Sequence, residues 1–216
     1  MERIEKTISS LEKNNIKAIF APKKEDAVKI VEELLFDGCT ITSGGSMSLV
    51  ESGVLELLKR PQYNYSDRNR LGITAEEQQQ VYKDVIGCDF YFCSTNALTE
   101  SGELINVDGN CNRISAISFG PKKVIMLVGI NKLCKDINEG FLRVKKIAAP
   151  KNCVRLGVNT PCSKLGHCIS LEKSQAPSIT EGCDCDGRIC AGYLVSGRQR
   201  VKDRIIVIIC GESLGY

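Results

Sequence analysis

Five cysteines in one short stretch are the densest group of potential metal ligands in the sequence: Cys162, Cys168, Cys183, Cys185 and Cys190. They lie in a segment, residues 159–192, that is rich in proline, glycine and serine. Thiolates bind zinc and iron–sulfur clusters, and chelation would order a segment with little apolar core of its own. Their spacing matches neither paired zinc knuckles nor the ferredoxin run. Two interpretations therefore stay open, an iron–sulfur cluster or zinc site and a set of free thiols.

The turn formed by Ser43, Gly44, Gly45 and Ser46 is the second candidate, because it joins an apolar strand to a helical pattern. Glycines allow a sharp turn and a close approach to a ligand, and the first N–H groups of a helix attract an anion. The turn lacks the Gly-Lys-Ser/Thr of a nucleotide-binding loop and the third glycine of the dinucleotide fingerprint. It predicts binding of a carboxylate or phosphate, and a plain turn capped by Ser46 is the alternative.

A polar segment follows the apolar stretch 89–93 and includes Asn96, Thr99, Glu100 and Gly102. It adds hydroxyl, amide and carboxylate side chains. Ligands of open α/β sheets collect beyond the carboxyl ends of the strands, where this segment would lie. Glu100 is the candidate catalytic residue, as a general base or nucleophile, and a solvated turn carboxylate is the alternative.

A second polar turn contains Asn110 and Arg113. Its arginine could bind a carboxylate or phosphate through two parallel hydrogen bonds. The alternative is an ordinary surface ion pair. The single histidine, His167, lies beside Cys168 and far along the chain from the glycine turn, which argues against a Ser/His/Asp hydrolase.

The helices and strands that position these groups are predicted from the spacing of apolar residues, which alternates along the chain between short apolar runs and helical spacing. Short apolar runs predict strands, and patterns with helical spacing predict helices between them. This order indicates a three-layer, Rossmann-like α/β fold with a mostly parallel sheet and a cysteine-rich loop region after residue 159. The predicted strands are residues 17–20, 39–42, 62–65, 89–93, 123–128 and 204–210, and the predicted helices are 23–36, 47–59, 74–86 and 137–148. Residues 103–107 and 114–119 are predicted to form a β-hairpin or a strand with a turn.

Composition excludes several classes of function. The chain has 216 residues, of which 43% are hydrophobic and 25% charged, and these values are typical of one globular domain over residues 1–216. The net charge of +3 is spread along the chain without a basic block, so no nucleic-acid partner is implied. No apolar run is long enough to cross a membrane, and the charged first residues do not resemble a signal peptide. We therefore expect no membrane partner and a cytoplasmic location.

Several motifs in a fixed order resemble the LUD (lactate-utilisation) domain family over nearly the whole chain. The matching stretches are ITSGGS at 41–46 with Leu49, ESG at 51–53, TNALTESG at 95–102, DGNCNR at 108–113, NTPC at 159–162, RIC at 188–190 and GESLGY at 211–216. The family is similar in fold to ribose-5-phosphate isomerase, glucosamine-phosphate deaminase and CoA transferases. The resemblance implies a ligand site at the glycine turn. In the family's usual cysteine spacing, Cys162, Cys168 and Cys190 fit, and either Cys183 or Cys185 is the fourth ligand.

The resemblance implies a subunit or accessory protein in the bacterial oxidation of L-lactate, or a related 2-hydroxy acid, to pyruvate. Its ligand would be a small carboxylate or phosphate, and iron–sulfur electron-transfer subunits are the partners implied. Two alternatives stay open. One is a non-catalytic binding module with structural zinc, and the other is an isomerase or CoA-transferase type of enzyme that uses Glu100.

Overall fold

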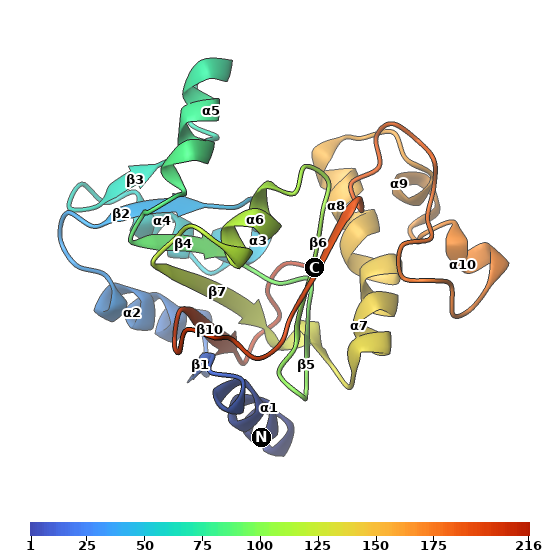
Figure 1. The fold of residues 1–216 in the computed structure, drawn as a ribbon, viewed down its shortest axis with the longest axis horizontal. Coiled ribbons are helices and arrows are strands. Elements are labelled where there is room, and N and C mark those ends of the chain that lie inside the picture. Colours follow the sequence, from blue (N-terminus) through green and yellow to red (C-terminus); the bar gives the residue numbers. More distant parts are fainter.

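Six parallel strands form the central sheet of the chain, which a computed structural model describes over residues 1–216 (Figure 1). All five strand pairs are parallel. The prediction of an α/β fold with a mostly parallel sheet is therefore confirmed. In spatial order the strands are β1 (Lys17–Ala21), β10 (Ile205–Cys210), β7 (Lys123–Gly129), β4 (Phe90–Cys93), β2 (Thr40–Ser43) and β3 (Asn64–Ser66).

Alternate residues of the central strands enter two separate cores, one on each face of the sheet. Phe92 and Leu127 pack on the face covered by α2 (Lys24–Leu34), α3 (Met47–Glu51) and α4 (Val54–Leu58). Their neighbours Cys93 and Met126 pack on the other face, against α1 (Glu2–Lys13) and α6 (Asn112–Ser118). Burial on both faces explains why β4 and β10 are apolar throughout.

A second sheet of four strands lies beside the first, in the order β8 (Leu133–Cys134), β5 (Ala97–Thr99), β6 (Leu104–Asp108) and β9 (Gly192–Ser196). Of the two forms predicted for 103–107 and 114–119, the structure contains the strand with a turn and not the hairpin. β6 pairs with β5 and β9, and the second segment lies in α6. The cause is Asp108, whose Oδ2 accepts hydrogen bonds from the backbone N–H groups of Arg113 and Ile114. A carboxylate at this position favours a helix start over a strand.

Two predicted helices differ from the observed ones. The segment 47–59 forms two helices instead of one, since Gly53 takes a left-handed conformation with φ of 83° between α3 and α4. The helix predicted to end before Pro150 continues instead, from α7 (Ile137–Arg143) through a π-helical turn (Val144–Ala148) into α8 (Ala149–Leu156). Pro150 comes just after the π-helical turn, which interrupts the regular hydrogen-bond pattern that a proline would otherwise break.

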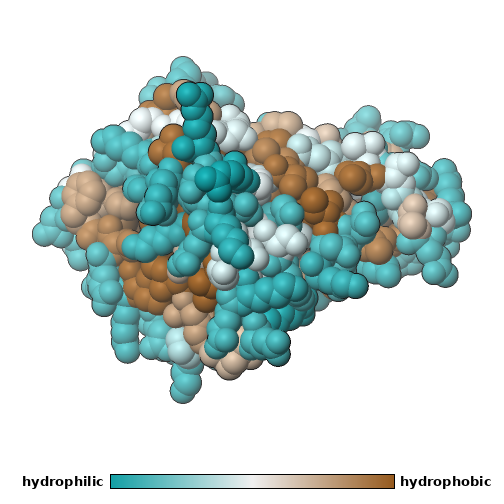
Figure 2. Space-filling view, turned by 60° about the horizontal axis from the view of Figure 1, so that its bottom comes forward, coloured by the Kyte–Doolittle hydropathy of each residue, from teal (hydrophilic) through white to brown (hydrophobic).

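The remaining elements extend to either side of the central sheet (Figure 1). Helix α5 (Ala75–Asp84) begins with a capping box of Thr74 and Glu77 and stands out at one end. Helices α7, α8, α9 (Pro161–Leu165) and α10 (Ser170–Lys173) gather at the other end. None of the helices is long and apolar enough to cross a bilayer. On the face drawn in Figure 2, apolar residues form patches that hydrophilic side chains interrupt.

Candidate functional site

A cavity of about 530 Å³ lies where the parallel strands end. One wall consists of residues that follow these strands, and the other consists of the loop after β6, the start of α6, helix α8 and residues 186–189. Such a position beyond the carboxyl ends is the usual ligand site of open α/β sheets. The residues that follow the strands are Gly45 and Ser46 after β2, Arg68 after β3, Ser94, Thr95 and Asn96 after β4, Lys132 after β7 and Tyr216 after β10.

Positive charge dominates the lining of this cavity. The cationic residues are Arg68, Arg113, Lys132, Arg155 and Arg188, and the acidic ones are Asp108 and Asp186. None of the five cations forms an ion pair with a carboxylate of the chain. A cleft with an excess of one charge attracts ligands of the opposite charge. The cavity is therefore suited to an anion.

Two of the arginines converge at the glycine turn. A Cβ atom on Gly45 would lie 3.1 Å from Nη2 of Arg68 and 3.7 Å from Nη2 of Arg155. Arg68 stacks over the ring of Tyr82 at 5.7 Å, and both Nε and Nη2 of Arg155 donate to Oδ1 of Asn152, at 3.0 and 2.8 Å. The Nε of Arg68 is buried without a hydrogen-bond partner. Guanidinium groups that converge in this way are the kind of donors that recognise a carboxylate or phosphate.

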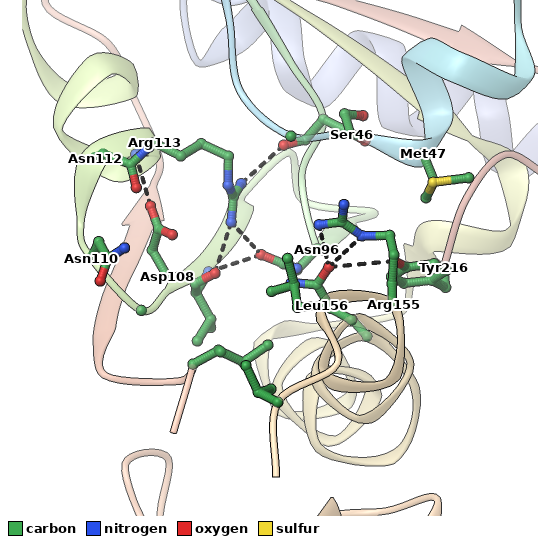
Figure 3. A pocket seen from close by; sticks show the side chains of 18 of the residues that line it. Ser46, Met47, Asn96, Asp108, Asn110, Asn112, Arg113, Arg155, Leu156 and Tyr216 are labelled. Atoms are coloured by element: carbon green, nitrogen blue, oxygen red, sulfur yellow. Dashed lines mark hydrogen bonds between the residues drawn. The ribbon is translucent and has the colours of Figure 1, made fainter. Parts of the chain in front are cut away.

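Arg113 stands across the cavity from Arg155, with Asn96 between them (Figure 3). Its Nη1 donates to the backbone O of Ser94 at 3.0 Å and to the side chain of Asn106, and its Nη2 donates to Oδ1 of Asn96 and to the backbone O of Val107, both at 2.8 Å. These donors hold the cavity wall together. Arg113 thus contributes positive charge to the cavity and organises its wall, whereas the predicted bidentate contact with a ligand would need donors that already have partners.

Glu100 lies away from the cavity. It sits in the turn between β5 and β6, where its carboxylate pairs with Nε of Arg3 at 2.6 Å and with Nζ of Lys6 at 2.9 Å. Hydrogen bonds from Lys6 and Arg3 lower the pKa of Glu100. In the same turn, Thr99 bonds to Glu103, and a Cβ on Gly102 would lie 2.9 Å from backbone atoms of α1. Glu100 and Gly102 thus contact α1, Thr99 bonds within its own turn, and none of the three lines the cavity.

The other predicted ligand-binding residues divide into two groups. Gly45, Ser46, Asn96, Asn110 and Arg113 line the cavity, and their role in binding a ligand stays a prediction. Ser43 and Gly44 lie beneath its floor, where Ser43 shares a hydrogen bond of 2.7 Å with the hydroxyl of Tyr65. A Cβ on Gly44 would lie 2.7 Å from Oη of Tyr91, so this position requires glycine to let the turn pass the tyrosine.

Four of the five predicted metal ligands surround one small cavity of about 20 Å³ with a mostly apolar lining: Cys162, Cys168, Cys183 and Cys190. The fifth, Cys185, has its sulfur 3.0 Å from that of Cys183. Cys153, which the sequence did not single out, has its sulfur 3.6 Å from that of Cys162, and burial raises its pKa to about 12. No three cysteine, histidine, aspartate or glutamate side chains are positioned to hold one metal ion in this structure.

Arg188 contacts both the cysteine-rich segment and the large cavity. It lines that cavity, and it also donates hydrogen bonds to the backbone oxygens of Cys183 and Cys190, both at 3.0 Å. The predicted metal segment therefore forms part of the wall of the large cavity. His167 bonds to Glu172 and lines neither cavity.

Four cationic residues of the site were not predicted from the sequence: Arg68, Lys132, Arg155 and Arg188. For Arg188, the signal was its place in the RIC stretch at 188–190. Arg68 and Lys132 each follow a strand within three residues, and the position beyond the strand end was the available signal. Arg155 had no such signal, because the predicted helix ended at residue 148 and did not reach this position.

Comparison with known proteins gives a match over almost the whole chain. A family model described as LUD domain matches residues 4–210. No curated protein matches. Similar solved structures include a DUF162 family protein from Deinococcus radiodurans, at 11% identity over 97% of this chain and 96% of that chain, with a TM-score of 0.49. Ribose 5-phosphate isomerase from Plasmodium falciparum has 19% identity, 52% coverage of each chain and a TM-score of 0.35.

Proposed function

This chain belongs to the LUD domain family, and we propose that it is a subunit or accessory protein in the oxidation of L-lactate or a related 2-hydroxy acid to pyruvate. Its role is to bind the carboxylate of that small acid in the large cavity. The observation that carries this proposal is the convergence of Arg68 and Arg155 at Gly45. Neither guanidinium has a carboxylate partner within the chain, and a bound anion would supply one.

The polar lining favours a hydroxylated or carbonyl-bearing acid over a purely apolar one. Asn96 and Asn110 line the cavity and can bond to a hydroxyl or carbonyl oxygen once the carboxylate is fixed. An inorganic phosphate shares the chemistry that the arginines recognise, so binding of the carboxylate and binding of phosphate have to be measured separately.

We expect the protein to bind L-lactate, pyruvate or phosphate, and not lactamide, in which a neutral amide replaces the carboxylate. Isothermal titration of each compound into the purified protein measures this. Affinity should fall as salt is raised, because partly exposed charge pairs are screened. Equal binding of lactate and lactamide would contradict the proposal.

The thiol-lined cavity is the second site of this proposal, and it would hold an iron–sulfur cluster or zinc. The donor chemistry fits, because four thiols border one pocket that excludes most polar groups. Arg188 fixes the backbone at Cys183 and Cys190, so it would help to hold these residues around a cluster. A cluster would supply one-electron chemistry, and an iron–sulfur partner subunit would then carry electrons onward.

Anaerobic purification followed by metal analysis and a visible spectrum tests this second site. We expect brown protein that contains iron and sulfide, and C183A should lose the colour. C210A is the matched control, since Cys210 is equally a free thiol but is buried in the central sheet and should keep the colour. Zinc without visible absorbance would favour the binding module with structural zinc over a redox subunit.

The isomerase or CoA-transferase alternative has no geometric support from Glu100, which pairs with α1.

A further inference from the structure

Lys132 is a buried lysine without a counter-charge at the edge of the anion-binding cavity. It follows β7, its residue is only 4% exposed, and it lines the cavity together with Ser94. Its Nζ lies 2.9 Å from Oγ of Ser48 and 2.9 Å from Oγ of Ser94. It pairs with no carboxylate, although an ionised group in such a place is normally neutralised by one.

The directions of these hydrogen bonds fit a neutral amine. The Ser94 hydroxyl donates to the backbone O of Leu127 at 2.6 Å, and the Ser48 hydroxyl donates to the backbone O of Leu214 at 3.1 Å. Both serine oxygens therefore accept from Nζ. A neutral amine has two N–H groups, which the two serines satisfy, and one lone pair. An ammonium group would have a third N–H, and the structure offers that N–H no acceptor.

Burial and the charges around Lys132 also favour the neutral amine. Burial lowers its pKa to about 7, and the cationic side chains of Arg143 and Arg113 add to this effect. Glu51 and Cys93 act in the opposite direction and do not outweigh it. An exposed lysine has a pKa of about 10.4, so Lys132 presents far more free amine near neutral pH.

We propose that Lys132 is a nucleophilic amine that forms an imine with the carbonyl carbon of a 2-oxo acid bound in the cavity. This inference rests on the proposed function, because the carboxylate of the acid is held by Arg68 and Arg155. The lone pair of Nζ forms the C–N bond, and the carbonyl π electrons move to the oxygen, which takes a proton. Loss of that oxygen as water, with a proton from the nitrogen, then leaves the C=N bond. No oxidant or reductant is needed.

Incubation of the protein with pyruvate and sodium cyanoborohydride at pH 7.5 tests the inference, because reduction makes the imine permanent. Intact mass spectrometry should show a single reduced adduct, and peptide mapping should place it on Lys132. Lys145 is the internal control, since it is also buried and bonded to a serine, Ser170, but lies at the thiol-lined cavity. It should stay unmodified. K132M should lose the adduct, and the mapping of the unaltered protein stands even if this variant does not fold.

Titration of pyruvate without the reductant separates the claim that the cavity binds the acid from the claim that Lys132 forms an imine with it. Binding of pyruvate with no adduct on Lys132, or with an adduct spread over exposed lysines, overturns the inference and leaves the proposed function intact. Binding of L-lactate without binding of pyruvate overturns the imine alone, and absence of binding of both acids overturns the imine and the proposed function together. An adduct on Lys132 that excess L-lactate suppresses supports both.

Discussion

Replacement of Arg113 by methionine is expected to lower the free energy of unfolding by about 3 kcal/mol or more. The guanidinium bonds to the backbone oxygens of Ser94 and Val107 and to the side chains of Asn96 and Asn106. Methionine fills much of the same space without any donor, so these acceptors lose their partner in a partly buried wall. Each buried acceptor left unpaired costs about 1–3 kcal/mol, and some will rebond to water.

Urea denaturation of R113M beside the unaltered protein measures this effect. R155M is the matched control, because Arg155 lines the same cavity but its side chain bonds to the side chains of Asn152 and Tyr216 and to no backbone oxygen of the wall. It should change stability by about 1 kcal/mol or less. A midpoint of R113M equal to that of the unaltered protein would show that Arg113 does not support the wall.

Reversal of charge at both converging arginines, R68E with R155E, is expected to weaken binding of pyruvate by about 100-fold or more, equivalent to about 2.8 kcal/mol. The two guanidinium groups are the attractive charges at Gly45, and two carboxylates in their place would repel the anion. Isothermal titration measures the change.

K59E with R60E is the control for net charge, because it changes the net charge by the same amount as the double arginine variant. Lys59 and Arg60 pair with Glu56 and Glu32, and neither lines the cavity. This control should bind pyruvate with nearly the affinity of the unaltered protein. An equal loss of affinity in K59E with R60E would mean that the overall charge, and not the two arginines, governs binding.

The central sheet could be predicted because its strands are buried on both faces. β7 and β10 are apolar almost throughout, and the helices between strands repeat at helical spacing, so periodicity alone was sufficient. The second sheet could not be predicted in the same way. Strand β6 pairs with β9, and the two are separated by more than 80 residues, which no local pattern reports.

The site was predictable where strand ends determine it. Gly45, Ser46 and Asn96 follow β2 and β4, and parallel strands bring such residues together. Glu100 follows the same polar segment, but β5 carries the chain away from the cavity before this residue is reached. Arg155 depends on a helix that continues past a proline, a tertiary effect that the sequence did not indicate.

A crystal structure of the protein soaked in pyruvate tests the central claim most directly, because the claim is that the large cavity receives a small anion between two arginines. We expect electron density for the carboxylate within hydrogen-bond distance of Arg68 and Arg155 above Gly45, with the carbonyl carbon directed toward Lys132. Pyruvate found only outside this cavity, or bound inside it with the carboxylate away from both arginines, would contradict the claim.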